Sequence, residues 1–155
     1  MKLGLDSNVL VASVKKLGEP FHDSALALSK KIRDEDGRGI GSALVLIEVP
    51  GALASASKMP IEKIYEVTAS VQDQFNLSIM EFQTYTDLAR DLMFEYRDLK
   101  SKWQIGSADF HHIATSVQEG CDVFVTTDEK HLLRAACKEA FEKHIRILNP
   151  TQALE

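Results

Sequence analysis

Short apolar segments alternate with segments of helical periodicity along the whole chain, and this alternation constrains the fold more than any other feature. The strand-like segments are 2–5, a brief stretch around Ile40, 77–82, 121–127 and 144–150. Between them, apolar residues recur every three or four positions, as in amphipathic helices. Strands separated by helices predict a parallel or mostly parallel sheet, because parallel neighbours need long crossovers. We therefore expect an α/β fold with helices on both faces of the sheet.

Capping residues and prolines set the expected helix boundaries. The first helix begins near Val9, and the others cover 22–34, 43–49, 61–75, 84–102, 108–119 and 129–136. We expect the side chains of residues 6–8, Ser42 and Ser107 to cap three of these helices. Pro50 should kink or end the helix before it, because proline lacks a backbone N–H. No repeat or long linker interrupts the pattern, so residues 1–155 are expected to form one domain.

Composition excludes several classes of protein. A chain of 155 residues that is 45% hydrophobic and 26% charged suits one globular domain. No apolar run is long enough for a membrane span or a secretory leader, so we expect a soluble, cytoplasmic protein. Cys121 and Cys137 have neither CxxC spacing nor enough partners for a disulfide framework. A net charge of -5 argues against a broad basic nucleic-acid surface, but divalent cations can reverse the sign locally.

Two aspartates directly follow predicted strands. Asp6 follows the first strand and Asp128 follows CDVFVTT, so both should emerge at the edge where ligands bind in parallel sheets. Each also suits a helix cap, and Asp109 suits the first turn of a helix. Glu48 lies within the apolar run LVLIEVPGAL, where an ionised carboxylate must be paired or metal-bound unless it faces solvent.

The order and context of these acids resemble the PIN-domain ribonucleases, particularly the VapC toxins of prokaryotic toxin-antitoxin pairs. The matching stretches are LDSNVL, LVLIEV, SADFHHIATSVQEG and DVFVTTDEKHL. The first and last are the more specific, since one strand ends in Asp-Ser-Asn and another in Thr-Thr-Asp. The resemblance covers nearly the whole chain. It implies a three-layer α/β/α fold around a parallel sheet of about five strands.

The resemblance also implies a site and an activity. It assigns catalysis and metal binding to four acids, with two polar side chains in support. The acids are Asp6, Glu48, Asp109 and Asp128, and the supports are Asn8 and Thr127. The implied protein is an endoribonuclease toxin that acts on RNA, forms a homodimer and is restrained by a small antitoxin. Carboxylate ligands select Mg²⁺ or Mn²⁺ over zinc. The alternatives are a PIN nuclease for RNA processing or DNA outside a toxin-antitoxin pair, and a non-catalytic PIN-like binding module.

Several residues near these acids have two interpretations. Glu129 is either a fifth carboxylate or a solvated residue at a helix start. His111 and His112 are expected in surface or interface packing, although His112 shares a helix face with Asp109. Trp103 either stacks a nucleobase beside nearby lysines or anchors the end of a helix.

Overall fold

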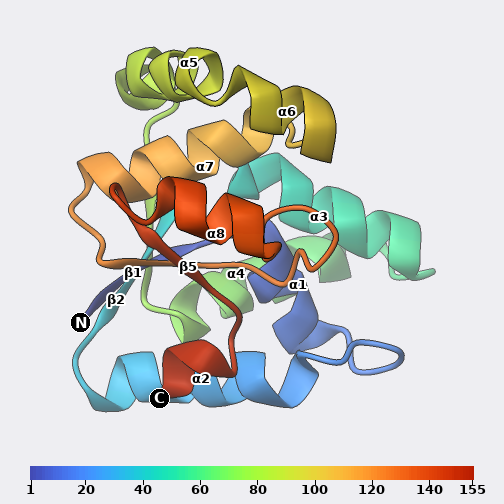
Figure 1. The fold of residues 1–155 in the computed structure, drawn as a ribbon. Helices are drawn as coiled ribbons and strands as arrows, with labels where there is room; N and C mark the ends of the chain where they lie inside the picture. The colour runs from blue at the N-terminus through green and yellow to red at the C-terminus, as the bar shows by residue number, and fades with distance from the viewer.

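The computed structural model describes residues 1–155, which form one five-stranded sheet with helices on both sides (Figure 1). The strands are β1 Lys2–Leu5, β2 Arg38–Ser42, β3 Leu77–Met80, β4 Val123–Val125 and β5 Arg146–Leu148. They are ordered β3-β2-β1-β4-β5, and every neighbouring pair is parallel. The expected parallel sheet is confirmed.

Eight α-helices and two short 3-10 helices complete the fold. They are α1 Ser7–Val14, α2 His22–Asp34, α3 Val45–Ala56, α4 Ile61–Gln74, η1 Gln83–Tyr85, α5 Thr86–Glu95, α6 Arg97–Trp103, α7 Ser107–Gln118, α8 Ala135–Phe141 and η2 Gln152–Leu154. None of them combines the length and the apolar character needed to cross a membrane.

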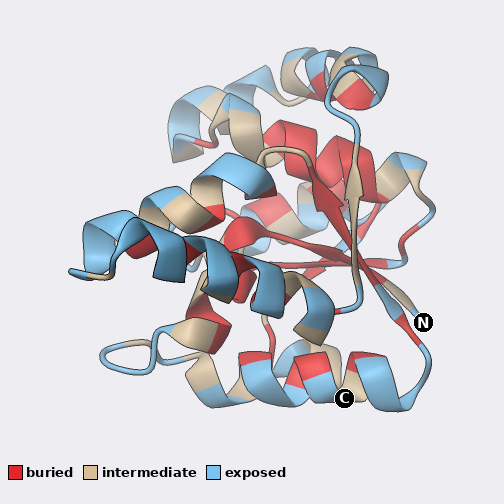
Figure 2. Ribbon diagram, turned by 180° about the vertical axis from the view of Figure 1, so that it is seen from behind, coloured by how far each residue is buried: buried red, intermediate tan, exposed pale blue.

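Two apolar cores, one on each face of the sheet, hold the three layers together. On one face, Leu5 and Val125 pack with buried residues of α1, α2, α3 and α4. On the other face, Ile40 and Phe124 pack with α5, α7 and α8. Figure 2 shows the buried residues along the strands and on the helix surfaces that face them. The expected α/β/α layering is therefore confirmed.

The sheet places β1 and β4 side by side at its centre. The chain leaves β1 toward β2 on one side, whereas it leaves β4 toward β5 on the other. Such a reversal of direction opens a crevice beyond the carboxyl ends of the two strands, where α/β proteins bind ligands. Asp6 directly follows β1, and Asp128 lies on the connector after β4. Both acids are at this reversal point.

The connector after β4 differs from the predicted helix at 129–136. Turns occupy the connector, and α8 begins only at Ala135. The Asp128 carboxylate accepts hydrogen bonds from the backbone N–H groups of Lys130 and His131, both at 3.2 Å. These local bonds stabilise a turn in competition with a helix.

Two other helix predictions were wrong in detail. The predicted helix at 84–102 is divided at Tyr96, whose ring packs on Phe141 at 4.7 Å and whose hydroxyl donates to the backbone oxygen of Ala140. Helix α3 continues through Pro50 to Ala56, so the predicted end of the helix at residue 49 was wrong. Val49 and Leu53 are buried on either side of this proline, so core packing outweighs one lost hydrogen bond.

Candidate active site

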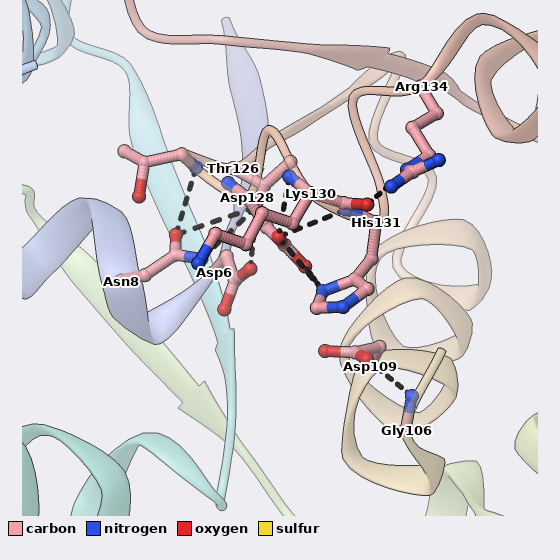
Figure 3. Close-up of polar contacts among 10 residues, drawn as sticks. Asp6, Asn8, Gly106, Asp109, Thr126, Asp128, Lys130, His131 and Arg134 are labelled. Carbon is pink, nitrogen blue, oxygen red and sulfur yellow. Dashed lines mark hydrogen bonds and ion pairs between the residues drawn. The ribbon is translucent and has the colours of Figure 1, made fainter. Parts of the chain in front are cut away.

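Asp6 is held between the ends of β1 and β4. Its carboxylate is buried, and the Thr126 hydroxyl donates to Oδ2 at 2.7 Å. The Asn8 amide donates to the same hydroxyl at 3.2 Å and accepts a bond from the Thr127 backbone N–H at 3.0 Å (Figure 3). The hydroxyl in contact with Asp6 is thus that of Thr126, whereas Thr127, the predicted support, contributes its backbone. Burial, the largest influence, raises the pKa of Asp6.

Asp109 caps the helix that carries it. Gly106 precedes α7, and its backbone N–H donates to Asp109 Oδ2 at 2.6 Å. The expected cap by the Ser107 side chain is absent, because Ser107 is already the first residue of α7. Burial and, to a lesser extent, the charges of Asp6 and Asp128 together raise the pKa of Asp109 to about 6, against the opposing Gly106 bond. The three carboxylates therefore interact electrostatically.

Glu48 reaches the same region from α3, where its side chain is half-buried and paired. The Ser7 hydroxyl donates to Glu48 Oε2 at 2.5 Å, and His112 Nε2 lies 2.7 Å from the same oxygen. Burial acts to raise the pKa of Glu48, but these two partners and the charge of His112 outweigh burial and lower it. The expectation that a carboxylate in this apolar run must find a partner agrees with this geometry.

The two histidines are core residues, contrary to the expected surface or interface packing. His112 has a side chain that is 1% exposed, and its Nδ1 has no hydrogen-bond partner. Burial acts to lower the pKa of His112, but Glu48 and Asp6 outweigh burial and raise it. His111 contacts the Ser42 hydroxyl and stacks on Phe82. Helix α7 lies between the sheet and α5, so it is buried nearly all round.

Asp128 is turned toward its own connector. His131 Nδ1 lies 2.9 Å from Asp128 Oδ2, next to the two backbone bonds described above (Figure 3). Glu129, the possible fifth carboxylate, is exposed and makes no side-chain hydrogen bond or ion pair. Its geometry matches the solvated alternative.

The four predicted acids share one edge of the sheet but not one pocket. Asp6 and Glu48 line a cavity of about 270 Å³ between α1 and α3. Asp109 and Asp128 do not line it, because each carboxylate folds back onto a backbone N–H of its own segment. They remain connected to the others by charge, since Asp109 interacts with Asp6 and Asp128, and Asp6 with Glu48.

The side chains, as they lie, form no group of three His, Cys, Asp or Glu residues that could hold a metal ion. The donors nevertheless suit a hard divalent cation, because all four acids offer oxygen. Asp109 Oδ1 makes no hydrogen bond, and the pKa of Asp109 is raised in part by neighbouring carboxylates. A cation would relieve that repulsion. The residues therefore fit such an ion in chemistry and charge.

Comparisons with known proteins agree with this geometry. A family model described as PIN domain matches residues 4–138. The FitAcB structure from Neisseria gonorrhoeae aligns with a TM-score of 0.65 and 19% identity over 97% of this chain and 99% of that one. A FitAB structure bound to an IR36 DNA fragment aligns with a TM-score of 0.60 and 20% identity. This alignment covers 97% of this chain and 95% of that one.

A third structure, VapBC2 from Rickettsia felis bound to a promoter DNA fragment, aligns with a TM-score of 0.56 and 18% identity. The alignment covers 96% of this chain and 98% of that one. At these identities the solved structures show a shared fold. No curated protein sequence matches the chain.

Proposed function

Because the chain belongs to the PIN-domain family, we propose that it is an endoribonuclease that depends on Mg²⁺ or Mn²⁺ and hydrolyses phosphodiester bonds of cytoplasmic RNA. The family match confirms the resemblance drawn from the sequence. One observation supports the proposal: Asp6 and Asp128 follow the neighbouring central strands β1 and β4 at the reversal point of the sheet, and the charges of both act on Asp109 of α7. We also propose that residues 1–155 form a single nuclease domain.

The chain's own residues prepare this edge of the sheet for an anionic phosphodiester. When bound, the divalent cation supplies an activated water and neutralises phosphate charge. Asp6, fixed by Thr126, and Asp109, fixed by Gly106, are the proposed direct ligands. Asp128 and Glu48 bind the ion directly or through water, and His112 holds the Glu48 carboxylate in place.

A cleavage assay with matched RNA and DNA strands tests this proposal. We expect the purified protein to cut single-stranded RNA with Mg²⁺ or Mn²⁺ and to lose that activity in EDTA, because the carboxylates alone repel the phosphate. A DNA strand of the same sequence should remain intact. Cleavage in EDTA would contradict the metal requirement, and cleavage of DNA alone would favour the alternative substrate. Absence of all cleavage would support a non-catalytic module.

We further propose that the protein is the homodimeric toxin of a toxin-antitoxin pair. The FitAB and VapBC2 structures hold their proteins bound to DNA, and this precedent supports the proposal. The cavity lined by Asp6 and Glu48 suits an arginine or lysine from an antitoxin, which would form charge-assisted hydrogen bonds there. Ile61 and Tyr65 of α4 and Phe94 of α5 expose apolar surface for pairing or docking.

Expression experiments test the regulatory part of the proposal. Production of the chain alone should arrest growth, whereas co-production with the protein of the neighbouring small reading frame should not, because that partner would block the acidic cavity. Light scattering should give about twice the chain mass of 17.3 kDa. The Asp6→Asn variant serves as the control and should be harmless. Unimpaired growth with an active ribonuclease would contradict the toxin, and a monomeric mass would contradict the dimer.

A further inference from the structure

Two cations lie over the chain's single tryptophan, close to the candidate active site. The guanidinium carbon of Arg134 is 4.3 Å from the centre of the Trp103 ring, and Lys102 Nζ is 5.2 Å from it. Cation-π contacts of this kind hold a guanidinium flat against an indole. Arg134 is exposed to solvent, and Trp103 is half-buried at the end of α6. We call these three residues the tryptophan cluster.

The cations of the tryptophan cluster lack acidic partners. The seven ion pairs of the protein include neither Arg134 nor Lys102. The only side-chain hydrogen bond of Arg134 runs from Nε to the backbone oxygen of Lys130. Its guanidinium is therefore positioned by a ring and a carbonyl, and both terminal nitrogens can bind an anion.

The tryptophan cluster joins two segments next to site acids: the end of α6, which precedes Asp109 of α7, and the connector that carries Asp128. Trp103 lies six positions before Asp109, and Arg134 lies six positions after Asp128. Figure 3 shows Arg134 on the connector that carries Asp128 and His131, with Asp109 at the start of the neighbouring helix. A nucleic-acid strand with its scissile phosphate at the carboxylates would thus extend past the cluster.

We propose that the tryptophan cluster is a binding subsite for the RNA strand beside the scissile phosphodiester, an inference that rests on the proposed nuclease function. Arg134 binds a backbone phosphate, because its planar fork matches phosphate oxygens and no carboxylate competes. The exposed part of Trp103 that Arg134 and Lys102 leave uncovered contacts a nucleobase. In a chain with a net charge of -5, such local cations favour the binding of a polyanion at this place on the surface.

Intrinsic fluorescence tests this subsite directly, because Trp103 is the only tryptophan. The probe is a 12-nucleotide single-stranded RNA, titrated in EDTA into an Asp6→Asn background so that cleavage is blocked. We expect Trp103 fluorescence to change on binding. In the same background, Arg134→Ala should weaken affinity about tenfold and lower the slope of log affinity against log salt by about 1. Arg134→Lys should recover part of the affinity.

Arg146→Ala is the matched control, because Arg146 is exposed at the opposite end of the sheet, where β5 begins. It should leave RNA affinity unchanged, and thermal unfolding should show that each variant is folded. Unchanged Trp103 fluorescence, or equal affinities for the Arg134 and Arg146 variants, would overturn the subsite. If the unaltered protein still cleaves RNA with Mg²⁺, only the subsite fails. Arg134-dependent binding without cleavage would keep the subsite and remove the nuclease.

Discussion

The Asp109→Asn variant is expected to lose RNA cleavage by at least about 100-fold, while its metal-free form becomes more stable than the unaltered protein at pH 7. The loss of activity follows from removal of a proposed cation ligand. The gain in stability follows because asparagine carries no charge. It removes the cost of burying an ionised carboxylate and the repulsion of that carboxylate by Asp6 and Asp128. The asparagine carbonyl can still accept the Gly106 N–H, so the start of α7 is preserved.

The stability gain should depend on pH in a defined direction. The pKa of Asp109 is raised from 3.8 to about 6, so the folded protein binds an extra proton between these values. The stability that this protonation contributes is fully present below about pH 3.8 and is lost as the pH rises through about 6. A shift of this size corresponds to at most about 3 kcal/mol at pH 7.

Urea unfolding in EDTA measures the difference in unfolding free energy between Asp109→Asn and the unaltered protein, once at pH 7 and once below about pH 3.8. The advantage of Asp109→Asn should be large at pH 7 and should nearly vanish in acid. Asp122→Asn is the control, because Asp122 is exposed beside the start of β4, at the opposite edge of the sheet. Equal advantages at both pH values would contradict the electrostatic explanation, and retained cleavage would exclude Asp109 as an essential ligand.

The alternation of strands and helices was sufficient to predict the fold because both signals are local. The prediction of a helix at 22–34 coincides with α2, whose apolar stripe follows the helical period. The connector after β4 was not predictable in this way. Lys130 and His131 suit a helix, and only the competing bonds to the Asp128 carboxylate divert the backbone into a turn.

The candidate site was partly predictable for a related reason. Strand ends locate Asp6 and Asp128 at one edge, since parallel strands all point the same way. The partners of Glu48 come from α1 and from α7, which lies across the sheet from α3, and no short segment contains that information. One signal for a buried His112 was present: residues 110–117, FHHIATSV, include no lysine, arginine or acid. Thr126 and Thr127 are adjacent in a strand continuation, where one residue of register decides which hydroxyl faces Asp6.

The Gly4→Ala variant is expected to lose about 3 kcal/mol of unfolding free energy, which corresponds to a melting temperature lower by about 10 °C. Gly4 lies on β1 beneath α7. A Cβ atom there would lie 2.1 Å from the Ser116 hydroxyl oxygen and 2.5 Å from Ser116 Cβ. The hydroxyl can rotate away, but Cβ is fixed to the helix backbone, so α7 itself must move.

Second-site variants identify the atom responsible for this loss. Ser116→Ala removes only the hydroxyl and should rescue Gly4→Ala little, because the 2.5 Å contact with Cβ remains. Ser116→Gly removes that contact and should restore most of the lost unfolding free energy. The remaining loss should be about 1 kcal/mol, the cost of a glycine within a helix. If Gly4→Ala had the same melting temperature as the unaltered protein, β1 and α7 would be able to separate without cost, and the prediction would be wrong. Because α7 carries both Asp109 and His112, its displacement should also lower RNA cleavage, and the Ser116→Gly double variant should recover cleavage together with stability.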